Sequence, residues 1–471
     1  MLALVLAVVV SEPLLVGFVE ALNKGGEPLQ AYLKANASES IAAPAFVDRM
    51  VRSTRPAVPF KIIKITENSA TAVRARVEDK QGEALGLSLI LDGKTPPKII
   101  GLRLQEAEAL DFPLPKDYPN WTTPAALVAE IRKDTDAPAL ILGIASKDRA
   151  TEIAVDGVRL LGSTALATTT DLWHIGSITK PMTATLIARL IERKKLDWDT
   201  TLAEALPGFE LTPQQKKITI HQLMRHRSGL PQDMGFNRAQ VAKIVGSEKD
   251  PAKVRERYIR DVLSRPRIHE PGSTFAYSNA GYTLLGLIAE RIEKVPYEAL
   301  LKREVFVPLG MNQSIAGPAG VPDQRTRGHV TGKPPVAHEV DEDLQRMLVP
   351  AGNVWVTIDD LLKFGRAHMA GLRGTDGYLK AATIRKLHEA LPEDEGDDGG
   401  YASGWVVGPL RGTATRHGHN GSNGTFVAEL AIYPDQELVI AAITNRGYPA
   451  EPSPALQALL AVARRLAPAK P

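Results

Sequence analysis

The 471-residue sequence contains no cysteine, and this absence removes several kinds of chemistry. Disulfide bonds, cysteine nucleophiles and thiolate metal sites are all excluded. Neither sign of charge dominates, because 57 basic residues oppose 54 acidic ones and leave a net charge of +3. Since no dense basic patch accompanies this balance, the sequence does not favour nucleic-acid binding.

Sequence motifs of several common enzyme classes are also missing. The chain has no P-loop and no glycine-rich dinucleotide motif after a predicted strand, so we expect no cofactor. The absence of G-x-S-x-G disfavours an α/β-hydrolase. The absence of H-E-x-x-H disfavours a zinc protease of that type.

The first ten residues, Met1 to Val10, are all apolar, but this run is too short to span a bilayer as a helix. We therefore expect no stable membrane span. The run is typical of the apolar core of a secretory signal peptide that covers residues 1–11 and is cut at Glu12. It predicts an extracytoplasmic protein, although no basic residue precedes the run. The alternative is a cytoplasmic protein in which these residues begin a domain helix.

Residues 12–105 differ in pattern from the rest of the chain and predict a small α+β domain. Helical patterns come first, and runs of alternating apolar residues follow. The helical patterns lie at Leu14–Leu22, Leu29–Lys34 and Phe46–Arg52, and the runs lie at Phe60–Ile65, Ala70–Val77, Leu85–Leu91 and Ile99–Leu104. Helices followed by antiparallel strands faintly resemble the cystatin-like cone domains. This domain carries no catalytic constellation, so we expect an accessory module that mediates protein contacts.

A proline-rich stretch within residues 106–122 predicts a linker. Residues 123–471 then predict a second, larger domain. We expect Ala139–Ile144 and Glu152–Leu161 to form a hairpin that begins its central sheet.

The most informative motif of the second domain is Ser177-Ile178-Thr179-Lys180, at the start of an apolar helical pattern. A spacing of three places Ser177 and Lys180 on one face of a helix, one turn apart. A desolvated lysine amine can lose its charge and accept the proton of a serine hydroxyl. The helix N-terminus also directs free backbone N–H groups toward the serine. The alternative is a helix cap followed by a surface lysine.

A second element, Tyr277-Ser278-Asn279, lies between a turn-rich stretch and another apolar helical pattern. A phenol near an ammonium group is more acidic than usual, so we expect Tyr277 to act as a phenolate base or to relay a proton. The amide of Asn279 could orient both the lysine and a substrate carbonyl. An ordinary turn before a helix is the alternative.

A third element, His419-Asn420-Gly421-Ser422, precedes two predicted strands, Val427–Tyr433 and Leu438–Thr444. We expect a substrate to lie along the first of these strands, with Gly421 allowing its close approach. The backbone N–H groups of Ser177 and Ser422 would then form an oxyanion hole. The alternative is a glycine-rich entry to a strand, with His419 at the surface.

His417 and His419 offer a competing interpretation. Alternate residues of a strand share a face, so these two imidazoles could bind zinc in a metal-dependent hydrolase. No further histidine or aspartate follows at close spacing, so we expect no metal site.

The three elements, in this order, resemble those of the serine β-lactamase and penicillin-binding-protein superfamily. Tyr-Ser-Asn is similar to the second element of its class C branch, and His-x-Gly is familiar from the peptidases, D-aminopeptidases and esterases of that branch. Further stretches are similar as well: Leu223–Leu230, Pro308–Met311, Ala351–Asn353, Thr357–Leu361 and Tyr401–Trp405. The resemblance extends from about residue 124 to about residue 462.

The resemblance implies a central antiparallel sheet flanked by helices, with a separate helical lobe, in an α+β protein of two domains. It implies that Ser177 becomes acylated and that Lys180 and Tyr277 share the proton transfers, in an order that the sequence leaves open. The remaining implied site residues are His419, near the substrate and Tyr277, and the substrate-binding residues Asn279, Gly421 and Ser422.

The implied activity is that of a serine hydrolase acting on a small-molecule ester, amide or peptide. A histidine at position 419 is mostly neutral near pH 7. The departure from lysine weakens the case for efficient β-lactam hydrolysis, because lysine offers a permanent positive charge to a carboxylate. A class C-like β-lactamase and a catalytically inactive penicillin-binding-like protein remain the alternatives.

Overall fold

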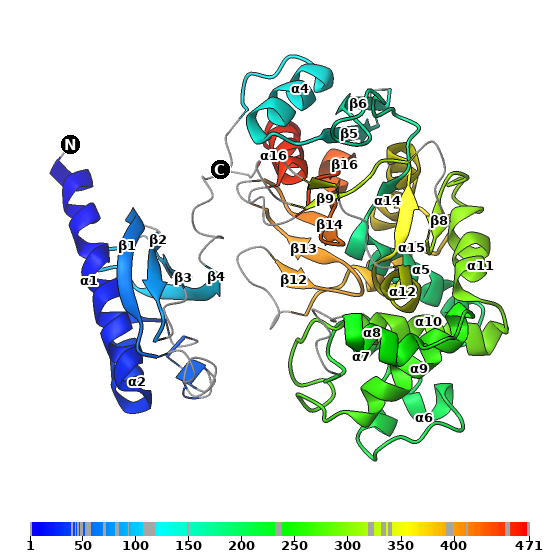
Figure 1. Ribbon diagram of the computed structural model, residues 1–471, viewed down its shortest axis with the longest axis horizontal. Helices are drawn as coiled ribbons and strands as arrows, with labels where there is room; N and C mark the ends of the chain where they lie inside the picture. Colours follow the sequence, from blue (N-terminus) through cyan, green and yellow to red (C-terminus); the bar gives the residue numbers. More distant parts are fainter. Residues whose placement is uncertain are drawn as a thin grey trace. The chain divides into compact units, whose positions relative to one another are not determined.

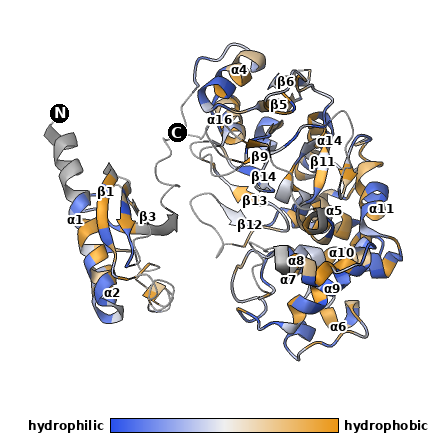
Figure 2. Ribbon diagram, in the orientation of Figure 1, coloured by the Kyte–Doolittle hydropathy of each residue, from blue (hydrophilic) through white to orange (hydrophobic). Residues whose placement is uncertain are grey.

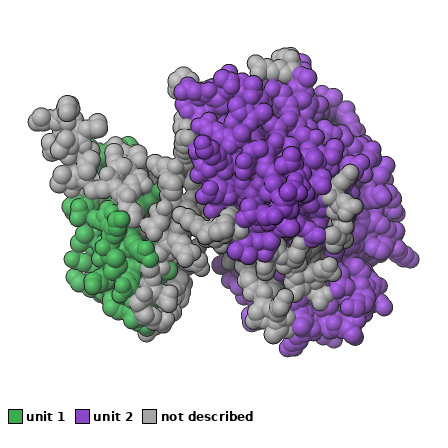
Figure 3. Space-filling model, turned by 45° about the horizontal axis from the view of Figure 1, so that its top comes forward, with its two compact units in different colours: residues 1–115 green, residues 116–471 purple. Residues whose placement is uncertain are grey.

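The computed structural model describes residues 2–38, 41–42, 44, 47, 50–51, 58–68, 72–80, 84–92, 94–106, 118–147, 150–230, 238–318, 325–330, 336–337, 342–391, 399–410, 413–447 and 453–468. The chain divides into two compact units, residues 1–115 and 116–471 (Figure 3). Each unit has a hydrophobic core made of its own residues. Most of the predicted linker, residues 107–117, lies outside the described residues.

The first unit packs helices against a four-stranded antiparallel sheet in the order β1-β2-β3-β4 (Figure 1). Its elements are α1 (Leu2–Lys24), α2 (Gly26–Asn36), β1 (Lys61–Asn68), β2 (Ala72–Glu78), β3 (Ala84–Leu91) and β4 (Ile99–Glu106). Because alternate side chains of a strand share a face, Val73, Ala75 and Val77 of β2 enter the core together. They share that core with Leu15 and Phe18 of α1. The helices predicted at Leu14–Leu22 and Leu29–Lys34 and the four predicted strands are confirmed. Most of the pattern at Phe46–Arg52 lies outside the described residues.

The helix α1 runs without a break from Leu2 to Lys24. It therefore joins the apolar run at the start of the chain to the first predicted helix. None of the helices in the described parts of the chain combines the length and the apolar character of a membrane span. Export and cleavage after residue 11 stay predictions.

The second unit is built on a seven-stranded antiparallel sheet in the order β12-β13-β14-β15-β16-β5-β6. Its strands are β5 (Ala139–Ser146), β6 (Glu152–Gly157), β12 (Gly400–Tyr401), β13 (Val406–Gly408), β14 (Arg416–Ser422), β15 (Val427–Tyr433) and β16 (Leu438–Thr444). The pairing of β16 with β5 brings the end of the chain beside the first strand of the unit (Figure 1). The predicted hairpin is present, but β6 ends at Gly157 instead of Leu161 because the chain turns there with a φ of +107°.

Helices cover both faces of this sheet, which explains why its strands β5 and β16 are apolar along almost their whole length. On one face, Leu140, Leu142 and Ile440 pack with α4 (Pro124–Thr135) and α16 (Pro454–Leu466). On the other face, Ile141 and Ile443 belong to the core that includes α5 (Thr179–Glu192) and α14 (Ile358–Leu372).

A helical lobe extends the second unit. It contains α6 (Leu202–Ala205), α7 (Ile220–Met224), α8 (Arg238–Val245), α9 (Pro251–Ser264), α10 (Asn279–Glu293) and α11 (Tyr297–Leu301). α9 is amphipathic, as its blue and orange stretches in Figure 2 show, whereas α10 is buried from Ala280 to Glu290. Short elements connect the lobe to the sheet: α12 (Glu342–Met347), α13 (Val349–Gly352) and a small sheet of β7 (Trp173–His174), β11 (Val354–Val356) and β8 (Ile315–Ala316). The predicted α+β architecture is confirmed.

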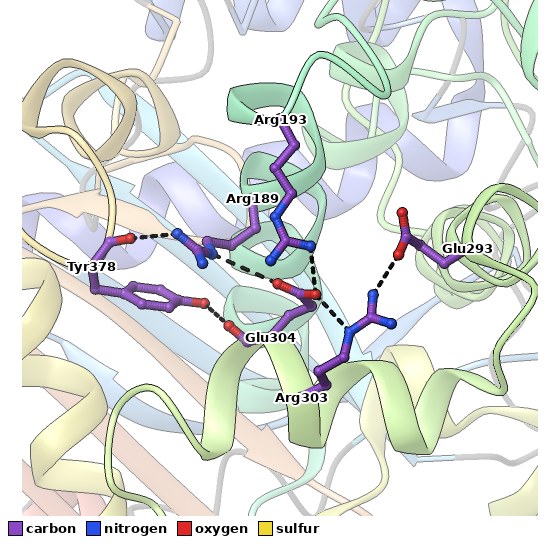
Figure 4. Close-up of polar contacts among 6 residues, drawn as sticks. All are labelled: Arg189, Arg193, Glu293, Arg303, Glu304 and Tyr378. Carbon is purple, nitrogen blue, oxygen red and sulfur yellow. Dashed lines mark hydrogen bonds and ion pairs between the residues drawn. The ribbon is translucent and has the colours of Figure 1, made fainter.

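A buried carboxylate holds the C-terminal part of α5 (Figure 4). Glu304, on the helical turn η4 (Lys302–Phe306), has a side chain that is 1% exposed and lies 2.7 Å from Arg193 Nη1 and 2.8 Å from Arg303 Nε. Arg189 Nε of α5 lies 3.8 Å from the other carboxylate oxygen, and its guanidinium donates to the Tyr378 carbonyl at 2.8 Å. The Tyr378 hydroxyl donates to the backbone carbonyl of Glu304. These contacts tie α5 to neighbouring segments at the end opposite Ser177.

Candidate active site

Ser177 lies in a single 3₁₀ turn, η2 (Gly176–Ile178), that leads directly into α5. The turn is fixed by the Thr179 hydroxyl, which donates to the Gly176 carbonyl at 2.7 Å. A cavity of about 620 Å³ opens beside Ser177. Six of the seven predicted site residues line this cavity: Ser177, Tyr277, Asn279, His419, Gly421 and Ser422.

Lys180, the seventh, is fully buried beneath the cavity. Its Nζ lies 2.9 Å from Ser177 Oγ, 2.8 Å from Asn279 Oδ1 and 2.6 Å from the carbonyl oxygen of Ala351. Desolvation by burial holds the pKa of the Lys180 amine well below its usual value of 10.5. The surface lysine that formed the alternative interpretation of Ser-x-x-Lys is therefore contradicted.

Tyr277 contacts both members of this pair. Lys180 Nζ lies 4.7 Å from the centroid of the Tyr277 ring. Burial raises the pKa of Tyr277, and its hydrogen bond with Ser177 opposes this rise only in part. The expectation of a more acidic phenol was wrong, because the burial that desolvates the phenolate also disfavours the lysine charge that would have stabilised it.

His419 lies on β14 and is 4% exposed, so it is not the surface histidine of the alternative interpretation. Its Nε2 lies 3.1 Å from the Tyr401 hydroxyl, and its Nδ1 contacts the carbonyl oxygen of Asn420. Burial first, and then the Lys180 charge, lower the pKa of His419 to about 3. The imidazole is therefore neutral at physiological pH.

His417, the other residue of the zinc hypothesis, has its own partner. Its Nδ1 lies 3.1 Å from Nδ1 of His388. Among the residues described, no group of three or more histidine, aspartate or glutamate side chains is arranged to hold a metal ion.

The His-Asn-Gly element forms strand β14 itself and does not merely lead into a strand. We expected the substrate along β15, but β15 pairs with β14 on one side and with β16 on the other along its whole length. Its backbone groups are used in the sheet, so that expectation was wrong. β13 pairs with residues 416–418 of β14, whereas residues 419–422 line the cavity.

Two glycines allow the serine turn to contact β14. A β-carbon at Gly421 would lie 2.1 Å from the Ile175 carbonyl oxygen and 2.6 Å from the Ser177 amide nitrogen. A β-carbon at Gly176, where φ is +50°, would lie 2.3 Å from the Ser422 amide nitrogen. The backbones that carry Ser177 and Ser422 are thus in direct contact at one side of the cavity.

The structure also brings to the site residues to which the sequence analysis assigned no role. His174 Nε2 lies 3.0 Å from Asn353 Oδ1, and its Nδ1 accepts from the Gly176 N–H at 3.1 Å. Tyr401 and His226 form a hydrogen-bonded group with His419. Three of these residues, Asn353, Tyr401 and His226, lie in stretches that resemble the superfamily, and this was the signal that could have revealed them.

The antiparallel sheet, the helical lobe and the serine–lysine pair between them are features of the serine β-lactamase and penicillin-binding-protein superfamily. Residues 125–464 match the family model described as Beta-lactamase, and the chain belongs to this family of serine hydrolases. The predicted superfamily and class of enzyme are confirmed.

Two curated relatives illustrate the similarity. "Penicillin-binding protein 4" of Amycolatopsis lactamdurans is 26% identical over 349 residues, which cover 71% of this chain and 87% of the relative. "Penicillin-binding protein 4*" of Bacillus subtilis (strain 168) is 27% identical over 269 residues, or 53% of this chain. The match spans 55% of the length of that second relative.

Solved structures share the fold. The octameric penicillin-binding protein homologue from Pyrococcus abyssi has a TM-score of 0.60 and 24% identity, over 73% of this chain and 78% of that one. D-amino acid amidase from Ochrobactrum anthropi SV3, complexed with L-phenylalanine amide, has a TM-score of 0.59 and 19% identity, over 73% and 98%. A class C beta-lactamase has a TM-score of 0.56 and 19% identity, over 71% and 94%.

Proposed function

We propose that the chain hydrolyses carboxylic amide, peptide or ester bonds through an acyl-enzyme formed on Ser177. The observation that carries this proposal is the set of three contacts made by Lys180. Asn279 Oδ1 and the Ala351 carbonyl can only accept hydrogen bonds. A neutral lysine amine has two N–H donors for these oxygens and one lone pair left for the Ser177 hydroxyl proton.

The opposite effects of burial favour an order for the proton transfers. Lys180, whose pKa is lowered, is available as the base that takes the Ser177 proton when Oγ attacks the carbonyl carbon. Tyr277, whose pKa is raised, stays protonated and is placed to donate to the leaving nitrogen or oxygen. The proton on Lys180 then restores the Tyr277 hydroxyl. In deacylation, water takes the place of the leaving group and attacks the acyl carbon, and the same proton transfers run in the opposite direction. The carboxylic acid is released and the Ser177 hydroxyl is restored.

In this scheme, the negative charge that develops on the substrate carbonyl oxygen lies beside backbone N–H donors. The N–H groups of Ser177 and Ser422 are proposed as the oxyanion hole, because contact between their backbones brings both to the cavity. Asn279, whose Oδ1 accepts a hydrogen bond from Lys180, is proposed to bind the substrate amide through its side-chain nitrogen.

The cavity favours an uncharged amide or ester next to an apolar group. Leu344, Leu348 and Val406 line it together with the amides of Asn420 and Asn423. The neutral His419 offers no positive charge to a carboxylate. Similarity to a protein described as a D-amino acid amidase agrees with this chemistry. We therefore propose a D-amino acid amide or ester as the substrate class, ahead of β-lactams.

A substrate panel with active-site labelling tests the proposal. We expect turnover of D-phenylalanine amide and p-nitrophenyl esters, with slower turnover of D-Ala-D-Ala peptides and a chromogenic cephalosporin. An alkyl phosphonate should label Ser177, as read by mass spectrometry of the peptide, and Ser177→Ala should lose both labelling and turnover. Full turnover by Ser177→Ala would overturn the mechanism. A stable adduct without turnover of any substrate would indicate the inactive, binding alternative.

We also propose a cellular location for the protein and a role for its first domain. An extracytoplasmic location rests on the apolar run at residues 1–10. The role of residues 12–105 as a module for protein contacts rests on its lack of any catalytic constellation. Fractionation of the native host cell, followed by determination of the mature N-terminus, tests the first of these.

A further inference from the structure

His226 lies behind the cavity, directly after α7, and has an unusual backbone. Its φ is +55°, a left-handed conformation that non-glycine residues seldom adopt. It is also 1% exposed. A buried histidine held in this conformation indicates that the surrounding structure requires its particular groups.

His226 holds the segment that carries Tyr277 at two points. Its carbonyl accepts from the Ala276 N–H at 2.8 Å, and its Nδ1 accepts from the Ser278 N–H at 3.1 Å. The imidazole also packs against the Tyr277 ring, with 4.2 Å between centroids. Both neighbours of Tyr277 and its aromatic ring are therefore positioned by one residue.

The same imidazole reaches His419 through Tyr401. Because Nδ1 of His226 accepts a hydrogen bond from the Ser278 N–H, the neutral ring carries its own hydrogen on Nε2. This Nε2 lies 3.1 Å from the Tyr401 hydroxyl. The Asn420 carbonyl can only accept, so His419 carries its hydrogen on Nδ1 and offers Nε2 to the Tyr401 hydroxyl, also at 3.1 Å. The hydrogen bonds thus run in one direction, from His226 through Tyr401 and His419 to Asn420.

We propose that His226 is a positioning residue that holds Tyr277 with its backbone and ring and, through Tyr401, fixes a single tautomer of His419. The effect of His226 on catalysis rests on the proposed function, whereas its effect on the tautomer of His419 does not. The Tyr282 hydroxyl, which is hydrogen-bonded to Tyr401, donates its own proton to the Met224 carbonyl at 2.6 Å, so it can only accept from Tyr401. Tyr282 therefore competes with Nε2 of His419 for the Tyr401 proton, and the imidazole nitrogen is the more basic of these two acceptors.

The charged groups around His419 support this direction. Lys180 of α5 and Arg416 of β14 both disfavour a second proton on its ring. Burial lowers the pKa of His226 well below 6.5, and repulsion by Lys180 and His419 in their protonated forms lowers it further. Tyr277 and Tyr401 stay uncharged because burial raises their pKa values. Both imidazoles therefore remain neutral at physiological pH, and the order of donors is preserved.

Tyr401→Phe tests the hydrogen-bond chain without removing the ring. In protein labelled with ¹⁵N-histidine, with His419→Gln used for assignment, wild type should show His419 protonated on Nδ1. In Tyr401→Phe the Nε2 resonance should move, and the pKa of His419 should rise by about one unit, because the neutral form loses a donor. Tyr433→Phe is the matched control, since it removes a buried hydroxyl bonded to Thr413. An unchanged His419 spectrum in Tyr401→Phe would overturn the proposal.

Two substitutions separate the roles of the His226 ring. In His226→Asn, the side-chain carbonyl can still accept from the Ser278 N–H, and asparagine tolerates a positive φ. The asparagine side chain is too short, however, for its amide NH₂ group to reach the Tyr401 hydroxyl. The longer side chain of His226→Gln can reach the Tyr401 hydroxyl, but it no longer places an acceptor beside the Ser278 N–H. We expect the Asn variant to shift the His419 spectrum as Tyr401→Phe does, and the Gln variant to restore it in part. A wild-type His419 spectrum in His226→Asn contradicts the chain.

Kinetics connect the tautomer to catalysis. In Tyr401→Phe and His226→Asn, kcat should fall about tenfold while KM stays within about twofold, because geometry and not binding is disturbed. A wild-type kcat in both variants would overturn the catalytic role of His226. If Ser177→Ala keeps full activity while the His419 spectrum responds as expected, the proposed function fails and the positioning by His226 stands.

Discussion

At the scale of single residues, burial acts in opposite directions on the two groups proposed to move protons. It lowers the pKa of Lys180 and raises that of Tyr277. Model-compound values would leave the amine and the phenol both protonated at pH 7. Burial instead shifts the amine toward its neutral form and keeps the phenol neutral, which allows one group to accept a proton while the other donates one.

Replacement of Lys180 tests the first half of this arrangement. Lys180→Ala should lower kcat/KM at least about a hundredfold, because the Ser177 proton loses its acceptor. In the wild type, kcat/KM should rise with pH through a pKa below 10.5, since the amine must be deprotonated, and this limb should be missing from the variant. Lys195→Ala, at an exposed position one helix length away, serves as the control. An unchanged limb in Lys180→Ala would assign the base to another group.

Replacement of Tyr277 tests the second half. Tyr277→Phe should lower kcat/KM for an amide at least about a hundredfold, because nitrogen leaves poorly without a proton. The loss for a p-nitrophenyl ester, whose leaving group needs no proton, should stay below about tenfold. Equal losses for the two substrates, measured on the same preparation, would contradict a role in leaving-group protonation.

Helix geometry alone predicted only the local contact of the site, whereas the distant members Tyr277, Asn279 and His419 were placed with it by the resemblance to the superfamily. Ser177 and Lys180 are one helical turn apart, so their contact follows from helix geometry. The pKa of Tyr277 could not be predicted, because it depends on how deeply the folded lobe buries the phenol. The groups that His226 joins, Tyr401 and His419, are far from it in the sequence, so their hydrogen bonds arise only when the lobe meets the sheet.

At the scale of elements, the contact between η2 and β14 sets the width of the site. A methyl group at Gly421 would overlap the Ile175 carbonyl and push the serine turn away from the strand. Gly421→Ala should therefore lower kcat/KM at least about a hundredfold. Gly377→Ala is a matched control, because a β-carbon at Gly377 meets no heavy atom within 4 Å. Wild-type activity in Gly421→Ala would show that the close contact is dispensable.

The buried carboxylate at the far end of α5 matters for stability rather than for chemistry. Glu304→Gln should lower the free energy of unfolding by about 1–3 kcal/mol, because Arg193 and Arg303 lose the buried carboxylate that balances their charge and keep only a neutral amide as acceptor. Urea unfolding measures this loss. Glu256→Gln, which removes a more exposed ion pair with Arg260, should change stability by less than about 0.5 kcal/mol. Equal effects of the two substitutions would contradict the importance of burial.

Most helices and strands could be predicted from the sequence, but which strands pair with one another could not. Alternating and helical patterns located β1 to β4, α5 and α10, because these patterns reflect which side chains are buried. The expectation that β15 would bind substrate failed because a largely apolar strand does not reveal how many neighbouring strands it has. Its pairing on both sides depends on β14, whose glycines and histidines gave no strand-like pattern.

At the scale of the whole molecule, the two units have separate cores, and every residue of the candidate site belongs to the second. Residues 116–471 produced alone should therefore fold and keep kcat/KM for a small ester within about threefold of the full chain. Circular dichroism and the ester assay measure this, with Ser177→Ala in the same fragment as the blank. A fragment that folds but has lost its activity would place part of the site in residues 1–115.

The pairing of β5 with β16 has a consequence for biosynthesis. β5 is almost entirely apolar, and it is synthesised long before β16, from which most of the second unit separates it in the sequence. In the interval, one edge of β5 lacks its native neighbour, and an unpaired apolar edge promotes association between nascent chains. Translation that pauses before β16 is complete therefore exposes the polypeptide to aggregation, and chaperones that shield such edges co-translationally would raise its yield.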